Sequence, residues 1–128
     1  MQHTVAILGE AEKGKFKTLY FLRDLGGLMD SFGSPPPESL GLYFAIQALL
    51  FERNLIYFRV EEEGFSEADY YAGLQTLERS TKVKRLSALC LPGVGDPKIL
   101  LASKNLCLLH NSLLLTTPQD LHDYLTSI

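Results

Sequence analysis

Short apolar segments alternate with helix-like segments along most of this chain, and this order restricts the fold more than any other feature. From Glu38 onward the expected order is helix, strand, helix, strand, helix, strand, helix. The expected helices cover 38–53, 66–78, 96–110 and 119–126, and the strands between them cover 55–60, 86–91 and 113–116. Such alternation is typical of a mainly parallel sheet with helices on its faces. We therefore predict a single α/β domain over residues 1–128, with a mixed, mainly parallel sheet flanked by helices.

Before this alternation, two further strands are expected at Thr4–Leu8 and Phe16–Leu22. Capping residues then place the ends of several helices. Asp24 can cap a short helix that stops at Gly33. The spacing of Ser66 and Asp69 is typical of a helix start. Asp96-Pro97 and Thr117-Pro118 each combine a cap with proline at the first helical position.

Size and charge exclude several classes of protein. A chain of 128 residues buries enough surface to fold without a metal or disulfide. Its net charge of -3 gives no overall attraction to nucleic acid, and the basic cluster Lys82, Lys84 and Arg85 is expected to be a solvated turn. No apolar run reaches the roughly 18 residues that a membrane span needs. We expect neither a nucleic-acid partner nor a membrane span.

The cysteine and histidine content gives no catalytic pattern. Cys90 and Cys107 both lie in apolar runs, which indicates reduced core thiols in a cytosolic protein. A catalytic thiolate needs a nearby base, and His110 is the one distant candidate. His110 is expected near the end of a helix, where a protonated imidazole would interact favourably with the helix dipole.

The segment after the first expected strand contains most of a phosphate-binding loop. Gly9 to Lys15 reads G-x-x-x-x-G-K after the apolar run Val5–Leu8. In a true phosphate loop, backbone N–H groups and the lysine hold phosphates while a following Ser or Thr binds magnesium. Here Phe16 occupies the Ser/Thr position, so the magnesium ligand is absent from the motif.

Two further features of this loop argue against phosphate. Glu10 and Glu12 would repel a polyphosphate, and a strand is expected to follow in place of an anion-binding helix N-terminus. We interpret Gly9 and Gly14 as turn glycines that join two strands. The charged side chains of this turn are expected to point to solvent or to a neighbouring subunit: Glu10, Glu12, Lys13 and Lys15.

Two other segments have weak chemical patterns. Glu61-Glu62-Glu63 follows an expected strand and could supply a metal ligand or a general base, although a solvated turn explains it better. Pro92–Asp96 resembles a glycine-rich loop but lacks the G-x-G-x-x-G spacing, and a tight turn before a helix cap explains it. We expect no catalytic residue, no metal site and no cofactor.

Taken in order, several motifs resemble the subunits of contractile tail sheaths, which occur in myophages and related injection machines. Val5–Gly14 looks like the family's opening strand with its Gly-x-Ala-x-x-Gly turn, and Arg23–Gly33 looks like the short helix that ends in Phe-Gly. Leu42–Val60, with Phe58-Arg59-Val60, is similar to the apolar helix followed by the Val-Arg-Val strand. Tyr71–Glu78 resembles the Ala-Leu-x-x-Leu-Glu helix, and Leu91–Asn111 resembles the Pro-Gly strand end with its helix.

This resemblance implies a structural, non-enzymatic subunit that polymerises around an inner tube. The expected partners are the chain itself, other sheath-like subunits and an inner tube protein, in the cytoplasm or in a virion or injection particle. Sheath subunits usually carry a further module where this chain has only Glu61–Ser66, and they have terminal arms and a C-terminal domain. The chain, which starts at its first strand and ends at Ile128, is therefore expected to match the core α/β domain alone.

An enzyme remains the alternative. It would be a small nucleotide- or phosphate-binding α/β protein that uses Gly9, Gly14 and Lys15, with Glu61 or Glu62 as the acidic group.

Overall fold

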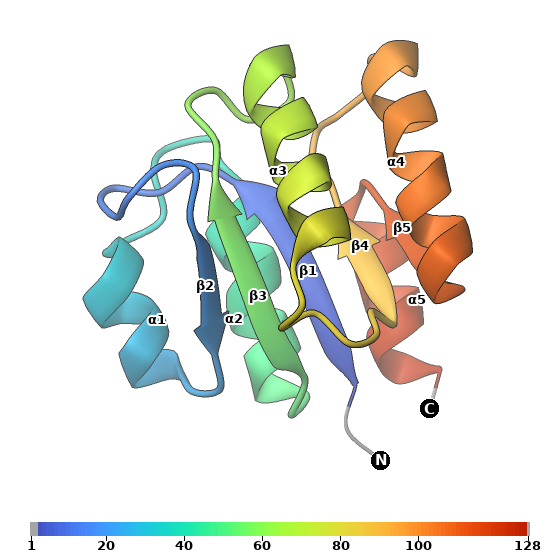
Figure 1. Ribbon diagram of the computed structural model, residues 1–128. Helices are drawn as coiled ribbons and strands as arrows, with labels where there is room; N and C mark the ends of the chain where they lie inside the picture. Colours follow the sequence, from blue (N-terminus) through green and yellow to red (C-terminus); the bar gives the residue numbers. More distant parts are fainter. Residues whose placement is uncertain (1–2, 128) are drawn as a thin grey trace.

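A computed structural model describes residues 3–127 and confirms the α/β class. Five strands form one sheet, and five helices cover its two faces (Figure 1). The elements, in chain order, are β1 (Thr4–Gly9), β2 (Leu19–Leu22), α1 (Leu25–Phe32), α2 (Gly41–Leu50), β3 (Asn54–Arg59), α3 (Glu67–Arg79), β4 (Ala88–Cys90), α4 (Pro97–His110), β5 (Leu113–Leu115) and α5 (Pro118–Thr126).

The sheet has the order β2-β3-β1-β4-β5, so the first strand of the chain lies at its centre. β1 pairs in parallel with β3 from Thr4 opposite Asn54, and with β4 from Val5 opposite Ala88. β5 also runs parallel, whereas β2 is the one antiparallel strand, at the edge next to β3. The sheet is therefore mixed and mainly parallel, as predicted.

Alternate residues of the central strand point to two separate cores. Val5 and Ile7 pack among the side chains of α1, α2 and α5, while Ala6 and Leu8 pack against α3 and α4. All four side chains are completely buried. Burial of each Val, Ile or Leu side chain stabilises the fold by about 1.5–3 kcal/mol. A strand buried on both faces reads as a continuous apolar run, which explains the sequence of Val5–Leu8.

Three of the predicted helix caps are confirmed by their hydrogen bonds. The Asp24 carboxylate accepts from Gly27 N–H at 2.7 Å, and α1 stops at Gly33, which has a φ of 74°. The Asp96 carboxylate accepts from Lys98 N–H at 2.8 Å at the start of α4. The Thr117 hydroxyl accepts from Asp120 N–H at 3.1 Å at the start of α5.

Two local predictions are wrong, and a third is confirmed only in part. The second strand covers Leu19–Leu22 only, because Lys17 has a φ of 57° and breaks the extended backbone after Phe16. The helix expected over 38–53 covers Gly41–Leu50, since Glu38 and Glu52 have left-handed backbones. Ser66 directly precedes α3, as its spacing from Asp69 indicated, although its side chain makes no capping hydrogen bond.

Within residues 3–127, no helix combines the length and apolar character needed to cross a membrane.

Candidate functional site

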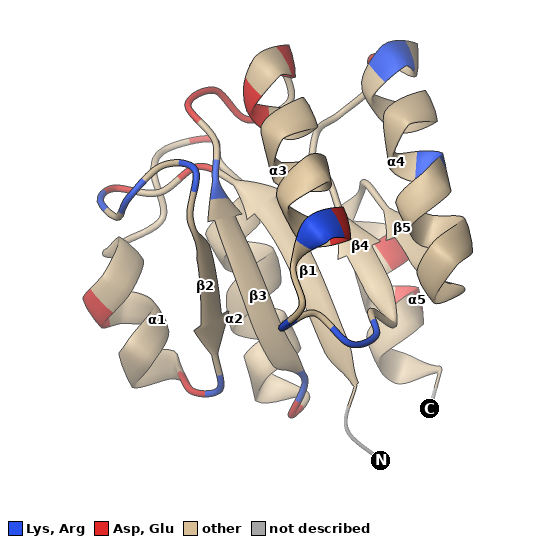
Figure 2. Cartoon of the chain, in the orientation of Figure 1, with Lys and Arg blue, Asp and Glu red and all other residues tan. Residues whose placement is uncertain are grey.

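The carboxyl ends of the parallel strands are the first place to look for function, because open α/β sheets usually bind ligands there. β1, β3 and β4 end at the same side of the sheet and continue into three loops, which cover 10–18, 60–66 and 91–96. Figure 2 shows acidic residues in the loop after β3 and at the start of α3, at this same end. The predicted phosphate-like loop and the three glutamates therefore lie close together.

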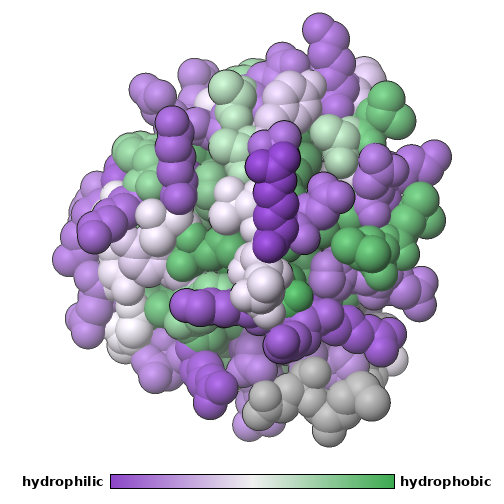
Figure 3. Space-filling view, in the orientation of Figure 1, coloured by the Kyte–Doolittle hydropathy of each residue, from purple (hydrophilic) through white to green (hydrophobic). Residues whose placement is uncertain are grey.

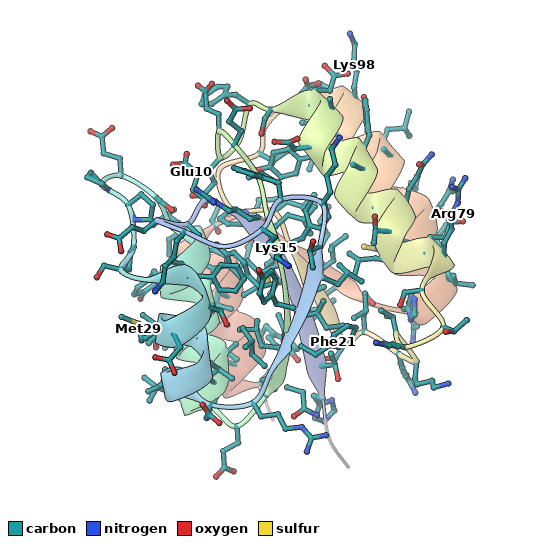
Figure 4. All side chains as sticks on the ribbon, turned by 60° about the vertical axis from the view of Figure 1, so that its left-hand side comes forward. Glu10, Lys15, Phe21, Met29, Arg79 and Lys98 are labelled. Carbon is teal, nitrogen blue, oxygen red and sulfur yellow. The ribbon has the colours of Figure 1, made fainter. Side chains whose placement is uncertain are left out.

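The backbone of the Gly9–Lys15 loop is already bonded to the protein. Glu12 N–H and Lys13 N–H both donate to the carbonyl of Phe32, at 3.1 and 3.2 Å. Lys15 N–H donates to the Tyr20 hydroxyl at 2.9 Å, while its side chain is exposed (Figure 4). A phosphate loop needs several free N–H groups that converge on one point. These N–H groups point instead to protein acceptors on α1 and β2.

The two glycines of this loop are required by close packing. A Cβ atom on Gly9 would lie 2.7 Å from the Gly41 Cα and 2.6 Å from the Tyr57 hydroxyl. Gly14 has a φ of 109°, and a Cβ atom there would lie 2.9 Å from the Phe32 ring. Gly14 is a turn glycine, as predicted. Gly9 is the last residue of β1 and is required because the start of α2 approaches it closely.

The Glu63 carboxylate is the central polar group at this end of the sheet. It accepts hydrogen bonds from Leu40 N–H at 2.6 Å and from Gly41 N–H at 2.9 Å, at the start of α2. The Ser39 hydroxyl donates to it at 3.1 Å, and Glu10 N–H donates at 3.0 Å. A helix N-terminus with free N–H groups favours an anion. Here the chain's own carboxylate occupies that position.

Glu10 points inward, which corrects the expectation that it faces solvent. Its carboxylate accepts from Glu63 N–H at 2.8 Å, and its backbone carbonyl accepts from the Tyr57 hydroxyl at 2.7 Å. Burial raises the pKa of Tyr57 well above its ordinary value, and the carboxylate of Glu63 raises it further. Tyr57 is thus a neutral hydrogen-bond donor that fixes the loop after β1.

The loops after β3 and β4 meet across the end of the sheet. A Cβ atom on Gly64 would lie 2.8 Å from the Gly93 carbonyl oxygen. The Tyr70 hydroxyl accepts from Gly64 N–H at 2.7 Å and holds this loop from α3. Because Gly64 has a φ of 88°, a larger residue would be strained as well as too close. The two loops therefore cover the position where a ligand would approach the end of β1.

Glu61 and Glu62 are exposed, as expected of a solvated turn. Their backbone N–H groups donate to the Asp69 carboxylate at 2.7 Å and to the Ser66 hydroxyl at 3.1 Å. Over residues 3–127, no group of three or more His, Cys, Asp or Glu side chains is arranged to hold a metal ion. Pro92–Asp96 forms the tight turn before α4 that the sequence indicated.

Cys90 is the last residue of β4 and is completely buried, whereas Cys107 and His110 lie on α4. Burial raises the pKa of both Cys90 and Cys107, so neither thiol has a thiolate-stabilising environment. His110 accepts a hydrogen bond through Nδ1 from Leu86 N–H at 3.2 Å. Burial lowers the pKa of His110, and the positive charge of Arg85 lowers it further. The imidazole is therefore a neutral acceptor, which corrects the expected imidazolium at the helix end.

The sequence prediction missed an exposed apolar surface on α4, which we call the leucine surface. Leu101, Leu108 and Leu109 of α4 are each about two-thirds exposed, at 69%, 71% and 67%. Leu113 of β5 is also 55% exposed, but it alternates with Leu114 and so lies on the α5 side of the sheet, opposite to α4. Figure 3 shows hydrophobic side chains at the surface on the side where α4 lies. The sequence hides this surface because leucine runs are equally typical of buried helices.

β5 has an unpaired strand edge. It is the last strand of the sheet and pairs only with β4. A groove of about 340 Å³ follows its outer side, between β5 and Tyr124 and Asp120 of α5. Unpaired edges can template pairing with another chain unless they are short, charged or covered. β5 is short, but it carries three leucines and no charge.

Comparison of the chain with family models, with curated proteins and with solved structures gives no match.

Proposed function

We propose that this protein is a structural, non-enzymatic subunit that acts by self-association, as the sheath-like motifs of its sequence suggest. The observation that carries the proposal is the leucine surface: three leucines of α4, each about two-thirds exposed, on the side of the helix that faces away from the sheet. Exposed apolar surface of this kind marks protein–protein interfaces. Two copies that bury this surface against each other would remove the leucines from water.

The carboxyl end of the sheet supports a role without catalysis. Glu63, Gly9 and Gly14 are engaged in holding loops together, and the N–H groups of the phosphate-like loop are bonded to protein acceptors. Glutamate side chains and packed glycines in these positions give rigidity. A rigid unit with an apolar surface suits a building block of a larger assembly.

The experiment that tests this function measures the molar mass of the protein in solution at a series of protein concentrations. Light scattering coupled to size-exclusion chromatography, with negative-stain microscopy of the concentrated protein, should show dimers or larger assemblies. The double variant Leu101→Lys with Leu108→Lys should be monomeric, because two charges would have to be buried at the interface. The matched control is Leu50→Lys, a 58% exposed leucine of α2 on the other side of the sheet, which should assemble like the wild type.

A wild-type protein that stays monomeric at the highest attainable concentration would overturn the proposal. If Leu50→Lys disrupts assembly as strongly as the α4 double variant does, the interface lies elsewhere. That result would overturn the assignment of the leucine surface.

A further inference from the structure

Two hollows meet on the sheet face beside β2 and follow that strand, from Arg23 at the end opposite to Glu63 to Lys17 near the end at which β3 stops. They have volumes of about 310 and 650 Å³, and both include Phe21 and Lys82 in their walls. We call the combined feature the basic groove. Its floor is apolar and is formed by Leu19, Leu55 and Ile56 of β2 and β3, together with neighbouring groups.

The basic groove is lined by half of the positively charged side chains of the protein. Six of the 12 Lys and Arg side chains line it, and neither hollow has an Asp or Glu in its wall. The six are Lys17, Arg23, Arg79, Lys82, Lys84 and Arg85. All are exposed, and within the described part of the chain none has an ion-pair partner. Six unpaired cations around one hollow repel one another, so an anion bound between them is stabilised.

The net charge of -3 hides this arrangement because it averages the charges of the whole chain. Figure 2 shows the basic residues of the α3–β4 loop at the end of the molecule opposite to the acidic loop after β3. An anionic chain beside the α3–β4 loop would therefore meet local positive charge away from the acidic loop after β3. The expectation of no nucleic-acid partner rested on this net charge and on the interpretation of Lys82, Lys84 and Arg85 as a solvated turn.

An aromatic ring lies between these cations. Phe21 is 47% exposed, although it belongs to a strand of the sheet. Figure 4 shows it on the side of β2 turned toward the end of α3, where Arg79 lies. Single-stranded nucleic acid is bound by exposed aromatic rings that stack on bases beside cations that contact phosphates. An acidic peptide would use the cations and would have no need of the ring.

We propose that the basic groove binds single-stranded nucleic acid, with a base stacked on Phe21 and phosphates on the surrounding Lys and Arg side chains. This activity is independent of the self-association proposed above, because the groove and the leucine surface share no residue.

The test is fluorescence anisotropy of a labelled oligothymidylate added to the full chain. Affinity should fall with salt, by about fiftyfold between 50 and 200 mM if four phosphates are contacted. Phe21→Leu keeps an apolar side chain but removes the ring, and it should weaken binding at least about fivefold. Phe65→Leu is the matched control, a 74% exposed phenylalanine in the acidic loop, and it should bind like the wild type.

Charge reversal tests the phosphate contacts. Lys82→Glu with Lys84→Glu should abolish measurable binding, whereas Lys98→Glu with Lys104→Glu on α4 changes the net charge equally and should reduce affinity far less. Circular dichroism spectra that match the wild type show that each variant is folded. No binding by the wild type, or equal loss in both double variants, would overturn the proposal. An oligoglutamate peptide of equal charge could also displace the oligonucleotide, while Phe21→Leu binds the oligonucleotide as tightly as the wild type. These two results together would assign the groove to an acidic protein partner and overturn the proposal.

Discussion

Glu10 and Glu63 bond to each other in both directions. The Glu10 N–H donates to the Glu63 carboxylate at 3.0 Å, and the Glu63 N–H donates to the Glu10 carboxylate at 2.8 Å. Each carboxylate thus accepts a hydrogen bond from the backbone N–H of the other residue, and the pair holds the loops after β1 and β3 together. Together with the N–H groups at the start of α2, this pair determines the shape of the end of the sheet.

Replacement of Glu63 by Ala should lower the free energy of unfolding by about 2 kcal/mol or more. The change leaves Leu40 N–H, Gly41 N–H and Glu10 N–H without their acceptor, and an unsatisfied buried donor costs about 1–3 kcal/mol. Glu62→Ala removes an exposed carboxylate from the preceding residue. This control should change the free energy of unfolding by less than about 0.5 kcal/mol. Urea unfolding followed by circular dichroism measures both. Equal stability of the two variants would show that the network at Glu63 contributes nothing.

Gly9→Ala should destabilise the protein by about 1–3 kcal/mol, the usual range for a side chain forced into a packed site. The added methyl group would lie 2.7 Å from the Gly41 Cα, which belongs to backbone and cannot move aside easily. Gly26→Ala in α1 is the control, since the nearest atom to its added Cβ is 3.5 Å away. Thermal unfolding should show a lower Tm for Gly9→Ala only, and an unchanged or higher Tm for Gly26→Ala.

The free energy of unfolding should fall as the pH is lowered and His110 becomes protonated. In the unfolded chain the imidazole has its ordinary pKa of 6.5, whereas burial and then Arg85 lower the pKa of His110 in the folded state. The unfolded state therefore takes up a proton first, and stability is lost as pH falls through 6.5 toward the folded-state pKa. Unfolding in urea at a series of pH values should show this slope in the wild type and a smaller slope in His110→Gln. His122→Gln, at an exposed position of α5, is the matched control for the loss of a histidine; a wild-type slope in His110→Gln would contradict the assignment.

Mg-ATP and Mg-GTP should not raise the Tm. A nucleotide at 100 times its Kd would add about 2.7 kcal/mol of stability, which a thermal-shift assay detects easily. The Gly9–Lys15 loop has N–H groups bonded to Phe32 and Tyr20, so phosphate would have to displace protein acceptors. A clear shift that Lys15→Ala abolishes and Lys13→Ala preserves would establish the nucleotide-binding alternative instead.

Local sequence predicted those elements whose ends are set by neighbouring residues. Asp96-Pro97 and Thr117-Pro118 gave the starts of α4 and α5 because a cap and a proline act within one turn. The apolar run Val5–Leu8 gave the central strand because a strand buried on both faces needs apolar residues throughout. Where a backbone turns left-handed at a residue other than glycine, as at Lys17, Glu38 and Glu52, the sequence gives little warning.

The candidate sites were less predictable because they depend on contacts between distant segments. Glu63 differs from Glu61 and Glu62 only in its partners, which come from residues 22–53 positions earlier in the chain. Phe21 and Lys82 face the same hollow although about half the chain separates them. Periodicity and spacing within one segment contain no information of this kind.

The central position of β1 has a consequence for synthesis of the chain. β1 is synthesised before both of its neighbouring strands. Asn54, the partner of Thr4, emerges fifty residues later, and Ala88, opposite Val5, emerges later still. Until then the nascent protein carries an apolar strand with two open sides, which is the kind of segment that draws chains into aggregates. Chains truncated before β4 should therefore be found in inclusion bodies or bound to chaperones, and the full sheet can close only after β5 has left the ribosome.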